Sequence, residues 1–418
     1  MNDVKASRIR IIVAMITCYF LFAILLNSVG TVILQAIHTM NVSKPQAASL
    51  EGFKDLPIAL VSFFVASFIP RIGYKVALIL ALTATLAASL MMPTIGTFWM
   101  LKLLFATIGG AFALVKVSVY ALVGQVTDNA QQHSSLFSFV EGMFMVGVLS
   151  GYWFFAWFID PQSPMAWLNV YYLLGAFALF TLLVVLQAPI QKVEVNESHH
   201  QGGSLHEFLS MIKLCAQSLV LIFVISTFLY VLIEQSIGTW LPTFNNEVLH
   251  MPVDISVQLT SIFAASLAVG RLLAGTILRY IGWYTLVNIN LVMMAALVVL
   301  TLPLTAAYEP QEVSSIFDVP FAALLMPLIG LFMAPIYPIL NSAMLSSLPS
   351  HQHAKMTGLI VVFSALGGTF GSLITGMLFA KLGGVNAFYS ALVPISLIAI
   401  ALFFFNKRTK LIQASAAA

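Results

Sequence analysis

Charged residues are scarce in this sequence. Only 8% of its 418 residues are Asp, Glu, Lys or Arg, and 60% are hydrophobic, whereas roughly a quarter of a typical soluble domain is charged. One globular core cannot enclose so much apolar surface, because cores stop growing beyond about 250–300 residues. A water-soluble fold is therefore excluded, and we expect an all-α integral membrane protein with the lipid bilayer as its solvent.

Cysteine and metal-ligating patterns are also rare. The two cysteines, Cys18 and Cys215, both lie in apolar runs, where a thiol is a small core side chain and predicts no disulfide framework. Histidines at 199–200 and 351–353 come in twos, which do not complete a metal shell. The sequence therefore predicts no metal site and no cofactor.

Two further absences exclude whole classes of protein. The formal net charge is only +3, which is too small and too scattered to predict a nucleic-acid partner. The phosphate-binding pattern G-x-x-x-x-G-K-[ST] does not occur, and no hydrophilic stretch is long enough to form a nucleotide-binding domain. A nucleotide-driven pump is thus excluded.

Long apolar runs fill most of the chain. The first, Ile11 to Ile37, exceeds the apolar region of about 7–15 residues in a secretory signal, so we expect a retained helix. Runs of about 20 residues predict twelve spans. They lie near 11–37, 46–70, 76–95, 98–124, 135–158, 168–188, 216–243, 255–279, 284–304, 319–347, 356–382 and 386–405.

Basic residues predict the orientation. If both termini are cytosolic, twelve Lys and Arg residues fall in cytosolic segments and only Lys44 and Lys381 fall in outer loops. Cytosolic loops of membrane proteins carry such an excess of Lys and Arg. We therefore expect a multi-pass protein of a bacterial-type inner (plasma) membrane with both termini in the cytosol.

The chain divides into two similar halves. The one long hydrophilic stretch lies at its middle, so the sequence predicts an N-terminal six-helix bundle at 1–190, a cytosolic linker at 191–213 and a C-terminal bundle at 214–418. FIPRIGYK follows the second span and TILRYIGWY the eighth, which places Gly73 and Gly282 209 residues apart. A short turn that recurs at the same place in each half indicates a parallel repeat of two six-helix units.

That architecture is typical of the major facilitator transporters, which the chain resembles over its whole length. The seventh span, Tyr230-Val-Leu-Ile-Glu234-Gln-Ser-Ile-Gly-Thr-Trp240, is similar to a signature of the fucose/glucose-galactose sugar permeases, a branch of proton symporters. The eighth, tenth and eleventh spans add Gly-Arg-x-x-x-Gly, Pro-Ile-Tyr-Pro and a glycine-rich helix. The fourth to sixth spans resemble TsgA-type permeases of the same group.

Two departures from that branch concern the substrate. The first span keeps Asn27 of an Asn-x-x-Asp pattern but has Gly30 at the acidic position. The fourth span has Val115, Val119 and Tyr120 where the branch has Glu-x-x-x-Asn-Pro. The resemblance implies a sugar or related polar solute, and the missing carboxylates leave an organic anion open.

Charged residues inside the spans are the candidates for function, because each costs at least about 2.5–3.5 kcal/mol at mid-bilayer. Glu51, Lys54 and Asp55 lie on roughly one side of the second span. They are either a salt-bridge cluster that tolerates burial or part of the transport path. We count Lys54 and Asp55 as substrate-binding candidates, and Glu51 and Asp55 as proton-coupling candidates.

Lys116 in the fourth span and Glu141 in the fifth are expected at similar depths, ~10–12 Å from the cytosolic face. They either pair with each other, or Lys116 faces the cavity and attracts an anionic substrate. Glu141 is a further proton-coupling candidate.

Glu234 is expected ~15 Å deep in the seventh span. Such a carboxylate is either a proton-coupling group or a protonated side chain bonded to a neighbouring helix. The remaining substrate-binding candidates are Asn27, Gln235, Trp240, Tyr337 and Asn341. The candidates for gating motifs are Arg71, Gly73, Lys75, Gly270, Arg271 and Gly275.

The sequence as a whole predicts a monomeric secondary active transporter, coupled to H⁺, that moves a small polar solute by alternating access. The alternative is a transporter of an organic anion such as a di- or tricarboxylate, which would use Lys54 and Lys116. A membrane-embedded enzyme needs catalytic groups clustered at one depth, whereas the charges here are spread over both halves.

Overall fold

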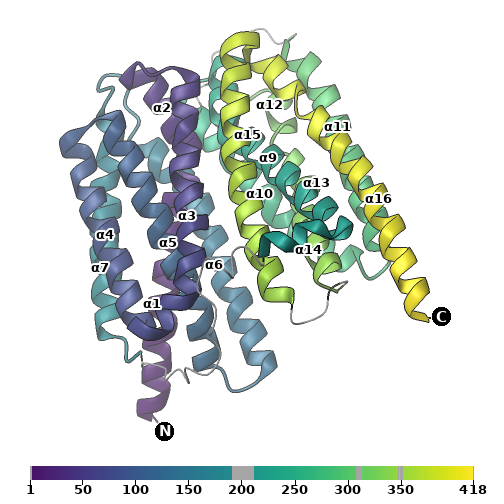
Figure 1. The fold of residues 1–418 in the computed structure, drawn as a ribbon. Coiled ribbons are helices and arrows are strands. Elements are labelled where there is room, and N and C mark those ends of the chain that lie inside the picture. The colour runs from purple at the N-terminus through teal and green to yellow at the C-terminus, as the bar shows by residue number, and fades with distance from the viewer. Residues whose placement is uncertain are drawn as a thin grey trace. The chain divides into compact units, whose positions relative to one another are not determined.

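The structure is a computed structural model that describes residues 2–190, 211–306, 313, 315–346, 348 and 352–417. Every regular element in these ranges is a helix (Figure 1). Most of the predicted linker, 191–213, lies outside the described residues. The protein is an all-α integral membrane protein, as predicted.

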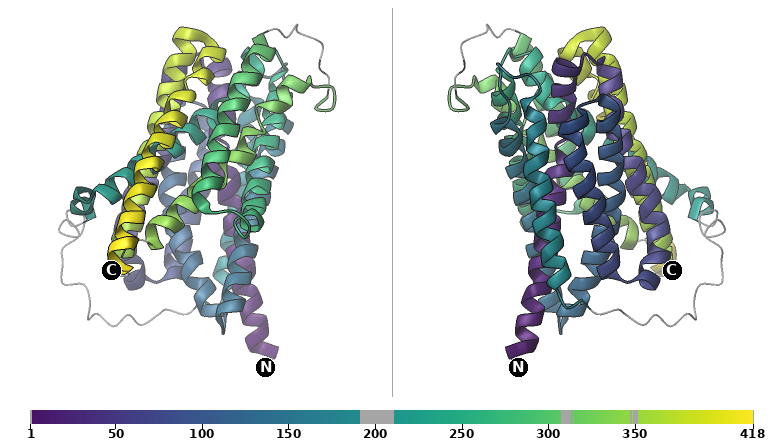
Figure 2. Two further views of the ribbon diagram at one scale, coloured as in Figure 1. Left: turned by 90° about the vertical axis from the view of Figure 1, so that its right-hand side faces the viewer. Right: turned by 90° about the vertical axis from the view of Figure 1, so that its left-hand side faces the viewer.

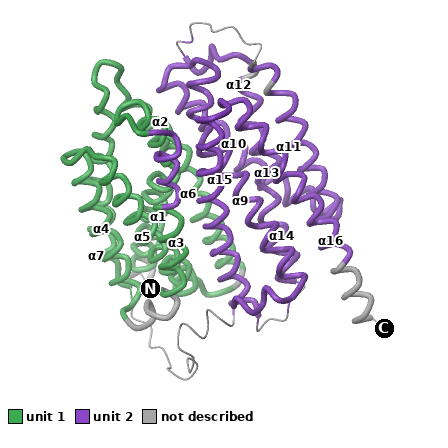
Figure 3. The backbone as a smooth tube through the Cα atoms, turned by 45° about the horizontal axis from the view of Figure 1, so that its top comes forward, with its two compact units in different colours: residues 1–42, 53–200 green, residues 43–52, 201–418 purple. Residues whose placement is uncertain are grey.

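The chain forms two compact units, coloured separately in Figure 3. Unit 1 comprises Met1–Val42 and Phe53–His200, and unit 2 comprises Ser43–Gly52 and Gln201–Ala418. The division passes through helix α3 (Lys44–Ile72). The beginning of α3 thus belongs to unit 2, and the rest of the helix belongs to unit 1.

Besides the rest of α3, the described residues of unit 1 contain six α-helices, of which α2 continues α1 and the others pack along one another (Figures 1 and 2). They are α1 (Asn2–Asn27), α2 (Val29–Met40), α4 (Tyr74–Ile95), α5 (Phe98–Val126), α6 (Ala130–Trp157) and α7 (Val170–Gln187). The first predicted span is therefore two helices that meet at Ser28. The Ser28 hydroxyl donates to the Leu25 carbonyl oxygen at 2.8 Å, a local bond of the kind that bends helices.

Unit 2 contains α9 (Ser218–Glu247), α10 (Val253–Ile277), α11 (Trp283–Ala306), α15 (His353–Tyr389) and α16 (Leu392–Ala417). The tenth predicted span is an apolar helical segment, Ala323–Ser346, that two short breaks divide into α12 (Phe321–Leu325), α13 (Ile329–Met333) and α14 (Ile336–Ser346). Pro327 and Pro335 lie in the two interruptions. Proline lacks the N–H that a continuous helix needs, which explains the breaks.

Glycines let α15 approach α9 closely. A Cβ atom on Gly367 would overlap the Phe228 carbonyl oxygen, and one on Gly371 would overlap the Leu232 carbonyl oxygen. A Cβ on Gly376 would lie 2.7 Å from the Trp240 ring. The prediction that the glycines of the eleventh span are sites of close helix contact is confirmed, since small residues let backbones approach in membrane proteins.

Ten helices in the described residues are long and apolar enough to cross a membrane. The predicted spans missing from that set are the second and the last. The second corresponds to α3, which carries several charged residues, and the last to the shorter apolar part of α16, Leu392–Lys407. Both of these spans are helical, so each of the twelve predicted spans corresponds to helix in the described residues.

The two turns of the internal repeat differ in backbone conformation. Gly73, between α3 and α4, has φ 89° and ψ 145°, a region that only glycine adopts without strain. Gly282, before α11, does not have a positive φ, and a Cβ there would meet no atom within 4 Å. Both repeated turns contain a glycine, but only the backbone conformation at Gly73 requires one.

We expect Gly73→Ala to lower the free energy of unfolding by about 1–3 kcal/mol, because alanine is strained at this φ and ψ. The matched variant, Gly282→Ala, should melt like the unsubstituted protein. Thermal unfolding in detergent, followed by tryptophan fluorescence, compares the two. Equal melting temperatures for both variants would contradict the assignment of strain to Gly73.

Candidate functional site

Lys116 projects from the inner part of a spanning helix. It lies on α5, ten residues before the helix end at Val126, or ~15 Å along the axis. Its side chain is exposed, and its Nζ atom lies 6.0 Å from the ring centre of Phe112 and 5.8 Å from that of Tyr120. Since an ammonium group is costly in hydrocarbon, we expect this face of unit 1 to contact water.

Glu141 of α6 is bonded to Tyr120 rather than to Lys116. The Tyr120 hydroxyl donates to Glu141 Oε1 at 3.1 Å. In the described part of the chain, no salt bridge connects Lys116 to a carboxylate. The expected ion pair between Lys116 and Glu141 is therefore not formed, although the two groups are close enough to interact electrostatically.

Tyr19 of α1 completes this cluster. Its ring centre lies 6.3 Å from that of Tyr120 and 5.6 Å from that of Phe144. Its side chain is buried, and its hydroxyl makes no hydrogen bond within the described residues. Unit 1 therefore contains a cation, a carboxylate and two phenols, contributed by α1, α5 and α6.

Lys54 and Asp55 are neighbours on α3 and are both buried. The Lys54 Nζ atom lies 3.5 Å from Asp55 Oδ1, an ion pair that neutralises both charges. The backbone is packed just as tightly here, because a Cβ atom on Gly109 of α5 would overlap the Lys54 carbonyl oxygen. Lys54 and Asp55 therefore lie where α3 packs closely against α5.

Glu51, at the start of α3, is completely buried within unit 2. The Thr239 hydroxyl of α9 lies 3.0 Å from Glu51 Oε2 and 3.0 Å from Gln235 Oε1. A hydroxyl has one hydrogen, so Thr239 can donate to only one of these oxygens at a time. Glu51 and Gln235 are therefore joined through a threonine whose single donor they share.

Unit 2 has its own polar cluster, built around Glu234. Tyr230 lies one turn before Glu234 on α9, and its ring centre is 5.5 Å from that of Tyr337 on α14. The Tyr337 hydroxyl lies 3.2 Å from the Ser364 hydroxyl of α15. Glu234 and Arg271 are both close enough to interact electrostatically with the two tyrosines.

The other substrate-binding candidates differ in accessibility. Trp240 is fully buried, stacks on Phe379 at 5.3 Å and donates its indole N–H to the Ser372 carbonyl oxygen at 3.1 Å. Asn341 of α14 is half-buried and near Tyr337, and its amide oxygen accepts no hydrogen bond from a described residue. Asn27 is half-buried and donates to the Ala23 carbonyl oxygen at 2.9 Å.

Two of the residues predicted as a gating motif in unit 1 have clear local roles. Gly73 forms the turn already described. The Lys75 Nζ atom donates to the carbonyl oxygens of Leu186 and Ala188, both at 2.8 Å, at the end of α7. This satisfies helix-end carbonyls that would otherwise lack donors. The Arg71 side chain lies outside the part of the chain described in detail.

Gly270 and Gly275, predicted as part of a second gating motif, lie on the same helix, α10, in different surroundings. A Cβ on Gly270 would overlap the Leu331 carbonyl oxygen of α13, whereas one on Gly275 would meet nothing within 4 Å. Arg271, beside Gly270, is exposed. The structure therefore makes Gly270 a packing residue of the α10–α13 contact.

Sequence reasoning did not single out Tyr19, Tyr120 and Tyr230 as site residues. A signal was present in the repeat, because Tyr230 follows Tyr19 by 211 residues and Tyr337 follows Tyr120 by 217. Both separations are close to the 209-residue offset. Each unit thus pairs a buried tyrosine of its first helix with a tyrosine further along the unit.

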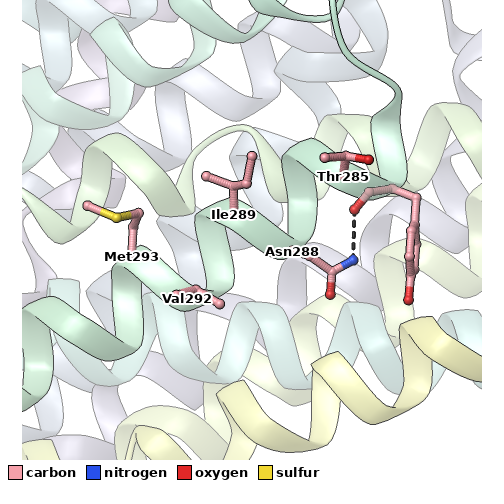
Figure 4. A pocket seen from close by; sticks show the side chains of 6 residues that line it. Thr285, Asn288, Ile289, Val292 and Met293 are labelled. Carbon is pink, nitrogen blue, oxygen red and sulfur yellow. Dashed lines mark hydrogen bonds between the residues drawn. The ribbon is translucent and has the colours of Figure 1, made fainter.

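A shallow depression on α11 is a different kind of feature (Figure 4). It is lined by Tyr284, Thr285, Asn288, Ile289, Val292 and Met293, all from one helix. Asn288 donates to the Tyr284 carbonyl oxygen at 2.7 Å. The depression has no charged side chain, so the polar clusters of the two units remain the candidate sites. No metal-binding group of three or more His, Cys, Asp or Glu occurs in the residues searched.

Residues 15–371 match the family model of the Major Facilitator Superfamily. The chain belongs to this superfamily. It is a transmembrane transporter and not an enzyme, and its fold is the twelve-helix major facilitator fold.

Solved structures support the fold. A point mutant of the nucleoside transporter NupG is 14% identical with a TM-score of 0.75, covering 96% of this chain and 99% of that one. A variant of the Escherichia coli fucose:proton symporter FucP is 15% identical with a TM-score of 0.60, at 96% and 99% coverage. A D-xylose–proton symporter is 16% identical with a TM-score of 0.66, at 95% and 96% coverage. No curated protein sequence matches the chain.

We expect Gly270→Ala to destabilise the transporter by about 1–3 kcal/mol, the usual cost of overpacking. Gly275→Ala is the matched control on the same helix and should be neutral or stabilising by up to about 1 kcal/mol, since alanine favours helix. Thermal melting of both purified variants is the measurement. A Gly275→Ala variant that melts as low as Gly270→Ala would contradict the packing role.

Proposed function

We propose that this protein is a proton-coupled secondary transporter that moves a small polar solute across the inner (plasma) membrane by alternating access. The observation that supports coupling is a carboxylate beside tyrosines within the spanning helices of each unit. Glu141 lies beside Tyr120 in unit 1, and Glu234 lies one turn from Tyr230 in unit 2. Carboxylates inside spanning helices mark proton relays in pumps and transporters.

The similar structures are consistent with this proposal. Two of them are described as proton symporters, one of fucose and one of D-xylose, and a third is a nucleoside transporter. Sugars and nucleosides are small polar solutes. At 14–16% identity the shared fold is the firm conclusion, and the coupling ion rests on the carboxylates of this chain.

One observation favours an organic anion over a neutral sugar as the solute. Lys116 is exposed, and no carboxylate of the described residues forms a salt bridge with it. A neutral sugar does not need a fixed cation in its path, whereas an anion gains from one. The second lysine considered for a di- or tricarboxylate, Lys54, is paired with Asp55.

Uptake into proteoliposomes tests the proposal. An inward proton gradient should drive accumulation of one solute from a panel of sugars, nucleosides and organic acids, and dissipating the gradient with a protonophore should stop it. Lack of gradient-driven accumulation for every solute of the panel, by protein that still exchanges one of them, would contradict proton coupling.

We expect Glu234→Gln to abolish accumulation driven by a pH gradient but to leave exchange between two solute-filled sides intact. Glutamine keeps the shape of the side chain and removes its titratable proton. The matched control is Glu247→Gln, because Glu247 lies at the end of the same helix and pairs with Lys44 at 3.0 Å. Undiminished accumulation by Glu234→Gln would show that the coupled proton is carried elsewhere.

A further inference from the structure

The Tyr120 hydroxyl can serve only one acceptor. It is a single donor, now directed at Glu141 Oε1 at 3.1 Å. Lys116 lies one turn before Tyr120 on the same face of α5. Its ammonium group has three N–H donors and makes no salt bridge with a described carboxylate. An incoming carboxylate would therefore find a cation and a phenol side by side, with the phenol already engaged.

The charges around Lys116 limit what can bind. Within unit 1, Tyr19 of α1 and Lys116 and Tyr120 of α5 lie close enough to Glu141 to interact with it electrostatically, and Cys18 is next to Tyr19. This set holds one cation and one fixed carboxylate. A second or third carboxylate on the ligand would find no further cation among these described residues of unit 1 and would be repelled by Glu141. A ligand with one negative charge is favoured over a di- or tricarboxylate.

The rings around Lys116 indicate the body of the ligand. The ring centres of Phe112 and Phe144 lie 5.9 Å apart, and those of Tyr120 and Phe137 lie 4.9 Å apart. Tyr120 is 36% exposed, and Phe137 and Phe144 are half-buried, so parts of these rings are accessible. Aromatic faces and edges favour an apolar or aromatic body over a polar one.

We infer that Lys116 and Tyr120 bind the carboxylate of a monocarboxylic acid with an apolar or aromatic body, and that Glu141 takes up a proton when it binds. This inference rests on the proposed transport function and names its substrate class. On binding, Tyr120 turns its O–H from Glu141 to the ligand carboxylate. Glu141, which has lost its donor beside a second negative charge, takes a proton from water and becomes a neutral acid. One anion and one proton are thus bound together.

Calorimetry on the purified full-length protein tests the inference, with benzoate as the probe and acetate, succinate and L-fucose for comparison. Titrations in two buffers with different heats of ionisation give the number of protons taken up per benzoate. We expect benzoate to bind more tightly than acetate or succinate and to bring about one proton with it at neutral pH.

Variants separate the roles of the three side chains. Lys116→Gln and Tyr120→Phe should each weaken benzoate binding by about tenfold or more, the usual loss for a hydrogen bond to a charged group. Glu141→Gln should still bind benzoate but without proton uptake. The matched control is Lys102→Gln on the same helix, whose ammonium is enclosed by the rings of Phe53, Phe98 and Trp99 at 5.2, 5.0 and 4.6 Å. It should bind like the unsubstituted protein.

Several outcomes would overturn the inference. The first is a Lys116→Gln variant that binds benzoate as tightly as the unsubstituted protein. The second is an equal loss of benzoate affinity in Lys116→Gln and Lys102→Gln. The third is proton uptake that persists when Glu141→Gln binds benzoate. If Lys116→Gln does not fold, Lys116→Arg keeps the charge and should retain binding, whereas Tyr120→Phe should still lose it.

Gradient-driven uptake of a sugar without benzoate binding would refute this inference and leave the proposed function standing. Benzoate binding with proton uptake, but without movement of any solute into proteoliposomes, would refute the proposed function instead.

Discussion

The cost of placing a charge in hydrocarbon governs this protein. At about 2.5–3.5 kcal/mol or more per residue, each charged side chain in a spanning helix needs a partner or water. Lys54 meets this demand by pairing with Asp55, and Glu141 by accepting the Tyr120 hydroxyl. Lys116 remains exposed without a salt bridge to a described carboxylate. That difference separates the partnered charges from Lys116, the side chain that we propose binds the solute.

Close backbone contact is the second constraint, and it places the charged residues. Lipid is as apolar as the helix surfaces, so helices associate through tight packing rather than through the hydrophobic effect. Gly109 brings α5 against α3, Gly270 brings α10 against α13, and Gly371 brings α15 against α9. These contacts fix how each helix is rotated, and thus which side chains of α5 and α9 face the polar clusters.

Much of this architecture was predictable from the sequence. Hydropathy located the spans, because the bilayer selects for apolar runs of about 20 residues. The glycines of the eleventh span were expected at a helix contact and lie at one. The tenth span was predicted as one helix, although Pro327 and Pro335 interrupt it. Hydropathy does not detect such breaks, since proline and its apolar neighbours keep the average high.

The sequence by itself determined that the chain is a membrane protein of two repeated halves and which charged residues lie within its spans. These are properties of runs of residues, and composition and spacing record them directly. Only the tertiary structure decided that Glu141 is bonded to Tyr120, that Lys116 is exposed and that Tyr19 lies against Phe144. Partners of this kind depend on the rotation and offset of neighbouring helices, which close packing sets and which no periodicity along a single helix encodes.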